Sequence, residues 1–186
     1  MIFPWLPPLL VNFVGGDRGA WRVDRLSAVT GRPLPAVDRV DVIEGEAVGD
    51  HAGVWVLRGT TSHERYVERP ERDALVARQP PLRRSGATRS ALIPVSKSPA
   101  WWELTQEERR AIIETRSRHI ATGLSYLPAI ARRLHHGRDL RQEFDFLTWF
   151  EFAPADAEAF EELVGRLRES EEWSYVDREI DIRLER

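Results

Sequence analysis

An almost continuous apolar run over residues 145–152 constrains the fold more than any other feature of this chain. A strand of this composition needs apolar cover on both of its faces, because neither face carries a row of polar side chains. Helices can cover only one of the two faces. We therefore expect the sheet to curl into a barrel around a ligand, or to pack against a second subunit.

The second half of the chain has the order strand, long bent helix, strand, helix, strand. The pattern predicts strands over residues 91–95, 146–152 and 173–184 and a helix over residues 156–167. The long helix begins after Thr105, a hydroxyl cap followed by glutamates in the first turn. We expect it to continue past Gly123, to bend at Pro128 and to resume over residues 130–134.

The first half of the chain has a shorter pattern of strands and a helix, which predicts a smaller version of the α+β unit expected in the second half. Apolar runs over residues 9–14 and 20–26 flank a glycine-rich turn and are typical of a hairpin. Further strands are expected over residues 37–43 and 53–57, then a helix that starts near Pro70. We predict an α+β fold of ferredoxin-like units, with a shortened lobe over residues 1–84 and a C-terminal lobe over residues 85–186.

Composition narrows the classes of function. Apolar residues make up 42% of the 186 residues, enough for a packed core, and the formal net charge of −3 gives no electrostatic reason to bind nucleic acid or an anionic membrane. The absence of cysteine excludes disulfides, iron–sulfur clusters and thiolate-bound metal, so a metal would need histidine or carboxylate ligands. The proline-rich N-terminus is a poor match to a signal peptide, and we expect a cytoplasmic protein without a membrane span.

Histidine is the natural candidate ligand in this chain. Its five histidines are His51, His63, His119, His135 and His136. Helical spacing places His119 on one stripe with Ile112 and Gly123, facing the interior. This position is compatible with a core histidine or with a metal or haem ligand. We expect His135 and His136 to be solvated residues at a helix end.

Arg132 lies beyond the bend predicted at Pro128. In an unbroken helix His119 and Arg132 could not flank one flat ligand, but a turn at Pro128 would bring the arginine to the opposite side. The apolar neighbours of Arg132 favour partial burial, and a buried arginine requires an anion. A surface helix charge is the alternative.

Other polar and aromatic residues allow two interpretations each. Trp101 and Trp102 suit either a large planar cofactor or a subunit interface. Lys97 could meet a ligand carboxylate or be a solvated charge. Of Glu171 and Glu172, one could accept the second ring N–H of a ligating imidazole, whereas the alternative is two solvated loop charges.

The order and spacing of several segments resemble the short, dimeric branch of the chlorite dismutase family. The segments that carry the resemblance are residues 13–21, 62–69, 91–112, 117–134, 144–154 and 171–184. The resemblance implies a haem b oxidoreductase that converts chlorite to chloride and dioxygen, through ferryl and hypochlorite, with formation of an O–O bond. It also implies a homodimeric α+β barrel of ferredoxin-like units.

The resemblance further implies roles for individual residues. His119 matches the proximal iron ligand, Arg132 the distal arginine and Glu172 the carboxylate that hydrogen-bonds the imidazole. Positions near the haem propionates are matched by Tyr66, Lys97 and Trp101, and pocket-lining positions by Trp102, Thr148, Trp149 and Phe150. Two alternatives stay open, a coproporphyrin-haem decarboxylase-like enzyme and a haem-binding α+β dimer without catalytic activity. The decarboxylases lack the distal arginine, which favours the chlorite reaction.

Overall fold

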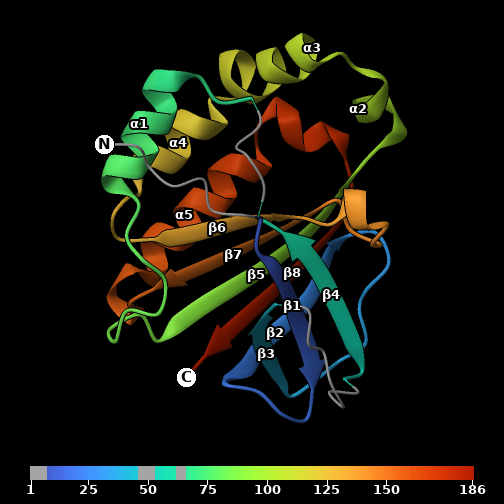
Figure 1. Ribbon diagram of the computed structural model, residues 1–186, viewed down its shortest axis with the longest axis vertical. Coiled ribbons are helices and arrows are strands. Elements are labelled where there is room, and N and C mark those ends of the chain that lie inside the picture. The colour runs from blue at the N-terminus through green and yellow to red at the C-terminus, as the bar shows by residue number, and fades with distance from the viewer. Residues whose placement is uncertain (1–7, 46–52, 62–65) are drawn as a thin grey trace.

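The computed structural model describes residues 8–45, 53–61 and 66–186, and these form one antiparallel barrel with helices outside it (Figure 1). The strands are β1 (Leu10–Gly16), β2 (Trp21–Thr30), β3 (Arg39–Glu44), β4 (Trp55–Thr60), β5 (Arg89–Lys97), β6 (Ala131–His136), β7 (Phe146–Phe152) and β8 (Val176–Glu185). The α-helices are α1 (Arg69–Arg78), α2 (Pro99–Glu103), α3 (Gln106–Arg110), α4 (His119–Ser125) and α5 (Ala157–Arg168). A π-helix, η1 (Ala111–Arg116), and 3₁₀ segments η2 (Arg138–Leu140), η3 (Pro154–Asp156) and η4 (Glu171–Tyr175) complete the described elements.

The barrel closes in the strand order β1-β3-β2-β8-β5-β7-β6-β4. Strands from both halves of the chain therefore belong to one sheet, joined by the β2–β8 and β4–β6 pairs. The predicted α+β class and the closure into a barrel are confirmed. The division into lobes over residues 1–84 and 85–186 stays a prediction.

The inside of the barrel is filled by side chains. Large apolar residues from facing strands, among them Phe13, Trp21, Trp149 and Ile182, form one buried cluster there. The prediction that the barrel surrounds a ligand is therefore wrong. The physical reason is the size of the inward-facing side chains, which are large enough to fill a barrel of this strand number.

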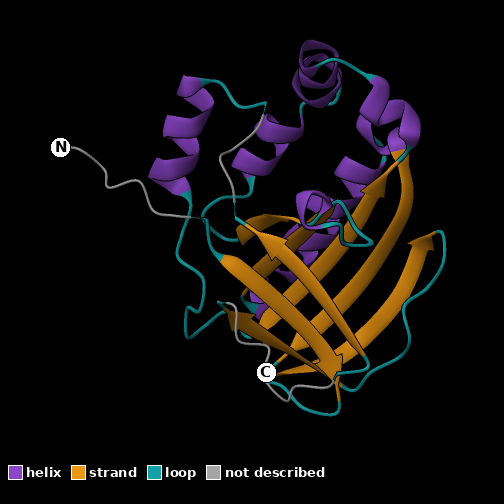
Figure 2. Cartoon of the chain, turned by 45° about the vertical axis from the view of Figure 1, so that its right-hand side comes forward, coloured by secondary structure: helices purple, strands orange, loops and turns teal. Residues whose placement is uncertain are grey.

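The outer face of the barrel carries a second core. Residues of β5 and β7 pack there against Phe160, Leu163 and Val164 of α5. The helices gather on one side of the barrel, as Figure 2 shows. The run over residues 146–152 thus receives cover on both faces, from the barrel interior and from the helices.

The predicted hairpin of the first two strands is wrong. Strand β1 pairs with β3 and β4, and β3 lies between β1 and β2. Every residue of β1 from Val11 to Val14 is buried, so the strand needs partners along both edges. Strand β2 instead pairs along most of its length with β8, from Arg22 to Thr30.

The long helix predicted after Thr105 is three consecutive elements. The cap is confirmed, because the Glu108 N–H donates to Thr105 Oγ1 at 3.2 Å and the Thr105 N–H donates to the Glu108 carboxylate at 2.7 Å. Beyond α3 the chain widens into the π-helix η1, and Arg118 adopts a left-handed conformation, φ 52°, that ends it. Helical spacing thus cannot be counted across this break, although His119 still begins a helix that faces the sheet.

The helical run predicted over residues 130–134 is also wrong. These residues belong largely to β6, which pairs with β7 from Ala131 to His136. Sheet pairing along β7 overrides the local helical pattern. As a consequence His135 and His136 are buried, with exposed fractions of 0% and 5%, and are not solvated helix ends.

His135 is a neutral histidine inside the fold. Its Nδ1 lies 3.0 Å from the Leu147 carbonyl, and Arg133 Nε donates to its Nε2 at 3.0 Å. Burial lowers the pKa of His135 to about 4, opposed by the hydrogen bond to the Leu147 carbonyl and assisted by electrostatic interaction with Arg133 and His136.

This low pKa predicts acid sensitivity. Between pH 6.5 and pH 4 the unfolded chain binds a proton at His135 that the folded chain excludes, so the free energy of unfolding falls as the pH falls. We expect His135 to contribute a loss of about 2 kcal/mol between pH 7 and pH 5. Urea unfolding of the wild type and of His135→Gln at both pH values measures this loss of unfolding free energy. An equal loss in the two proteins would contradict the assignment.

Within the described ranges, no helix is both long and apolar enough to cross a membrane.

Candidate functional site

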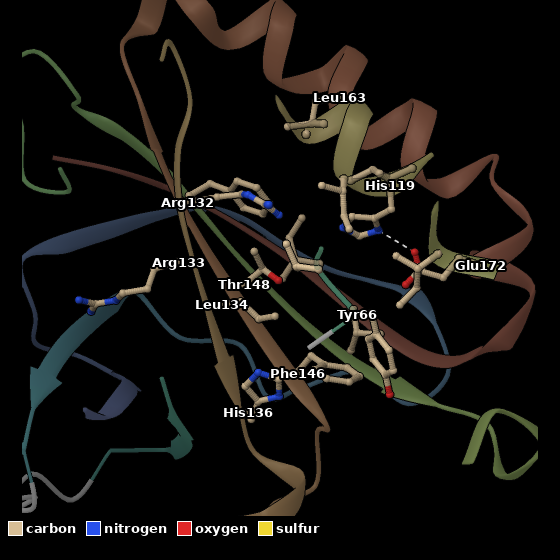
Figure 3. Close-up of a pocket in the computed structure, with 18 of the residues that line it drawn as sticks. Tyr66, His119, Arg132, Arg133, Leu134, His136, Phe146, Thr148, Leu163 and Glu172 are labelled. Carbon is tan, nitrogen blue, oxygen red and sulfur yellow. Dashed lines mark hydrogen bonds and ion pairs between the residues drawn. The ribbon is translucent and has the colours of Figure 1, made fainter. Parts of the chain in front are cut away.

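A cavity of about 580 Å³ lies outside the barrel, between the sheet and the helices (Figure 3). Its floor is formed by outward-facing residues of β5, β6 and β7, and its walls by α1, α4 and α5. Most of the lining is apolar, and the volume falls in the range of about 300–1,000 Å³ that is typical of sites for small molecules and cofactors. The geometry therefore supports a ligand on the outer face of the sheet.

His119 points into this cavity from the first turn of α4 (Figure 3). Its Nδ1 lies 2.6 Å from Glu172 Oε2, so the imidazole donates this N–H to the carboxylate. The hydrogen bond leaves Nε2 as the nitrogen available to a ligand. A carboxylate behind an imidazole fixes its tautomer and increases its donor strength toward a metal.

Glu172 is held from three sides. Lys97 Nζ donates to Glu172 Oε1 at 2.9 Å, and the Glu172 backbone N–H donates to Ser117 Oγ at 2.9 Å. Burial alone would raise the pKa of the Glu172 carboxyl, but the charges and hydrogen bonds of His119 and Lys97 outweigh it and lower that pKa to about 2. Glu172 is therefore an ionised carboxylate at neutral pH.

The structure separates the two adjacent glutamates. Glu172 is 5% exposed and contacts His119, whereas Glu171 pairs with the half-exposed Arg116 at 2.8 Å. Only the second glutamate is placed to support the imidazole, as the resemblance implied.

Lys97 is buried and is not a solvated loop charge. Its side chain is 4% exposed, and its ammonium lies 4.7 Å from the ring centroid of Trp101 and 5.3 Å from that of Trp173. Its ionic partner in the structure is Glu172. The expected contact of Lys97 with a ligand carboxylate stays a prediction.

The Lys97–Glu172 pair predicts a large effect on stability. Breaking one partner of a buried ion pair leaves an uncompensated charge, so Glu172→Gln should lower the free energy of unfolding by about 3 kcal/mol. The matched control is Glu171→Gln, which removes an exposed pair and should cost less than about 1 kcal/mol. Denaturant unfolding of both variants compares them. Equal losses of unfolding free energy in the two variants would show that the buried ion pair of Glu172 contributes no more than the exposed pair of Glu171. The double variant K97M/E172Q removes both charges and should recover part of the free energy lost in Glu172→Gln.

Arg132 lines the same cavity as His119. It lies on β6, and its Cζ is 3.6 Å from the position that a Cβ on Gly123 would occupy. Gly123 is one turn beyond His119 on α4, so the guanidinium lies within ordinary van der Waals distance of the helix that carries His119. The chain between α4 and β6 reverses direction and brings both residues to one cavity, as the sequence predicted, although Arg132 is on a strand and not on a helix.

The structure brings together some of the other expected site residues. Tyr66, Trp101, Thr148 and Phe150 line the cavity. The hydroxyl of Tyr66 accepts a hydrogen bond from Arg109 Nη1 at 3.2 Å. Their expected roles around a cofactor stay predictions.

Two expected lining residues lie elsewhere. Trp149 points into the barrel, where it stacks on Phe13 with ring centroids 5.6 Å apart, because neighbours on a strand face opposite sides and Phe150 already faces the cavity. Trp102 lies outside the cavity lining, stacked against Phe146 with centroids 6.1 Å apart. The expectation that Trp102 and Trp149 line the pocket is therefore wrong.

Sequence reasoning missed several lining residues. Strand alternation from Arg132 leads to His136, and alternation from Thr148 leads to Phe146, but only once β6 is recognised as a strand. Residues of α1 and α5 also line the cavity, and nothing in the sequence beyond the apolar faces of these helices indicated it. These residues include Leu75, Val76, Leu163, Val164 and Leu167. His51 and His63 lie outside the described residues.

The cavity fits a haem. In the described part of the chain, no three histidines or carboxylates are grouped to hold a metal ion, so a metal bound to His119 must bring its remaining ligands with it, as a porphyrin does. The indole N–H of Trp101, 1% exposed and lining the cavity, has no hydrogen-bond partner among the described residues. A buried donor without an acceptor suits a ligand that carries carboxylates.

Fold and site together define a class of α+β barrel protein in which a carboxylate-supported histidine faces an apolar cavity on the outside of the barrel. The family model described as chlorite dismutase matches residues 52–184. The chain belongs to the chlorite dismutase family.

Individual relatives agree with this assignment. The crystal structure of dimeric chlorite dismutases from Nitrobacter winogradskyi is 54% identical, covers 95% of this chain and 99% of its own, and has a TM-score of 0.88. A mutant chlorite dismutase from Candidatus Nitrospira defluvii shares the fold at 17% identity and a TM-score of 0.69, over 96% of this chain and 92% of its own. A chlorite dismutase from Ideonella dechloratans is 37% identical over 84 residues, which is 45% of this chain and only 27% of the length of that relative.

Proposed function

We propose that this protein binds haem b through His119 and decomposes chlorite to chloride and dioxygen. The observation that carries the proposal is one apolar cavity that contains both a carboxylate-supported imidazole and a guanidinium. Membership of the chlorite dismutase family and the extent of the similarity to the Nitrobacter winogradskyi protein support it.

The residues behind the imidazole prepare it as a metal ligand. The Glu172 carboxylate accepts the Nδ1 proton, and Lys97 balances the charge of this carboxylate, so the proton stays at Nδ1 and the Nε2 lone pair faces the cavity. When bound there, haem iron supplies redox chemistry at oxygen, which none of the amino-acid side chains can supply.

Arg132 is the residue that we expect to act on chlorite. Its guanidinium is charged at any working pH, and its planar fork can donate two hydrogen bonds to an oxyanion. In an apolar cavity these interactions are stronger than in water. Arg132 therefore orients chlorite and retains an anionic chlorine–oxygen product that would otherwise diffuse out and oxidise the protein.

We further propose a homodimer in the cytoplasm. The dimeric state is supported by the Nitrobacter winogradskyi relative, whose structure is that of a dimer. The cytoplasmic location stays a prediction from the N-terminal sequence. Sedimentation of the purified protein at several concentrations tests the dimer, and a monomer at all of them would contradict it.

The function is tested by reconstitution followed by an oxygen electrode. We expect about one haem per chain, a Soret spectrum with an axial histidine, and release of one dioxygen for each chlorite consumed. A chain that binds haem and releases no dioxygen from chlorite would favour a haem-binding dimer without this activity. Protein loaded with coproporphyrin haem in place of haem b tests the decarboxylase-like alternative, and conversion of its propionates to vinyl groups with release of carbon dioxide on addition of peroxide would favour it.

A further inference from the structure

A second depression, of about 500 Å³, opens on the barrel surface near residue 186, whose end of the chain is marked C in Figure 1. It shares no lining residue with the cavity that contains His119. Its lining is unusually basic for a chain of formal net charge −3. The residues around it are Ala20, Arg22, Arg39, Thr88, Arg89, Pro154, Glu185 and Arg186.

Four of these residues form one row across the sheet. Arg39 on β3 is the cross-strand partner of Arg22 on β2, Arg22 is the partner of Glu185 on β8, and Glu185 is the partner of Arg89 on β5. Directly opposite side chains point to the same face and lie about 5 Å apart at Cβ. The neighbours of this row on the same strands, including Trp21 and Leu184, fill the barrel interior, so the row faces outward.

The row contains more positive than negative charge. Glu185 pairs with both Arg22 and Arg89. Arg39 Nη1 donates to the Gly19 carbonyl at 2.9 Å, and Arg186 Nη2 donates to carbonyls of the segment before β5. Neither Arg39 nor Arg186 forms an ion pair with a carboxylate in the part of the chain that the structure describes.

This arrangement has an electrostatic cost unless an anion is present. Arg22 and Arg39 are like charges directly opposite each other on adjacent strands, which destabilises a sheet. The Glu185 carboxylate, which is shared by Arg22 and Arg89, cannot also neutralise Arg39. An anion of two negative charges in the depression would remove the repulsion and satisfy the free donors of several guanidinium groups.

We propose that this row binds the phosphoryl group of a small phosphate ester. Guanidinium forks match the geometry of a phosphate dianion with paired hydrogen bonds, and the hydroxyl of Thr88 offers a further donor. The depression is much larger than a single tetrahedral anion, which leaves room for the organic part of the ester. This site requires neither haem nor the chlorite reaction, so its test is independent of the function proposed above.

Calorimetric titration with inorganic phosphate, glycerol 3-phosphate and chloride, at constant ionic strength, tests the site on the full chain. We expect both phosphates to bind more tightly than chloride, and the ester to bind more tightly than inorganic phosphate. Arg39→Gln should weaken both phosphates about tenfold, because it removes one charge-assisted contact. Arg186→Gln should weaken them too, and since Arg186 is exposed at the chain end this second variant tests the site even if Arg39→Gln fails to fold.

The matched control is Arg32→Gln. Arg32 is an exposed arginine, with 78% of its side chain accessible, that pairs with Glu143 away from the row. It should leave phosphate binding unchanged. Equal affinity for phosphate in wild type, Arg39→Gln and Arg186→Gln would mean an adventitious ion only and would overturn the proposal. A change of oligomeric state in R39Q/R186Q, measured by sedimentation, would identify the row as a subunit contact and would also overturn it.

Discussion

His119→Ala is expected to reduce the haem content of the reconstituted protein from about one per chain to less than a tenth of that value. The imidazole of His119 is the side chain in the cavity whose ring nitrogen is supported by a carboxylate, and this support fixes its tautomer and increases its donor strength toward iron. The apolar lining would still attract a porphyrin weakly, so we expect residual binding that washes out on a desalting column.

The measurement is the Soret band and the haem-to-protein ratio after desalting. Added imidazole should restore part of the binding, because the deleted side chain leaves a space of its own shape beside Glu172. Glu171→Gln, which alters an exposed neighbour of the site, should retain full haem content. An unchanged spectrum and stoichiometry in His119→Ala would show that another residue ligates the iron, and the proposed site would be wrong.

Arg132→Ala is expected to leave haem stoichiometry intact and to reduce the total dioxygen released per chain by about tenfold or more. The guanidinium lies against Gly123 at the wall of the cavity, where its loss removes charge without opening the apolar core. Without it, anionic oxidant should escape, so the haem should bleach after fewer turnovers.

Total dioxygen yield at excess chlorite, together with the rate of Soret loss, measures this effect. Arg132→Lys keeps the charge but not the planar fork, and we expect an intermediate yield. Arg166→Gln removes a half-exposed arginine on α5 and should leave the yield unchanged. An undiminished yield in Arg132→Ala would contradict the retention role of Arg132, even if haem binding by His119 were confirmed.

Local signals in the sequence were sufficient for much of the secondary structure. The hydroxyl and glutamates at Thr105 and the proline at position 70 predict helix starts that the structure contains. The apolar run over residues 146–152 is a strand buried on both faces. These signals depend only on residues close together in the chain, so they can be recognised from the sequence alone.

The site was predicted unevenly. The resemblance identified His119, Glu172 and Arg132, and the structure brings all three to one cavity. It also assigned Trp149 to the pocket, whereas alternation along β7 turns this side chain into the barrel. Spacing along an assumed continuous helix gave the right orientation for His119, although a π-helix and the left-handed Arg118 interrupt that helix.

The sequence by itself determined which segments are apolar, where most helices begin and which side chains could ligate a metal. Only the tertiary structure decided that residues 131–136 form a strand, that β3 separates β1 from β2, and that the cavity lies outside a filled barrel. Strand pairing joins residues far apart in the chain, and its free energy depends on cross-strand partners that no local pattern specifies. The row of Arg39, Arg22, Glu185 and Arg89 exists for the same reason, because four separate strands place these residues side by side.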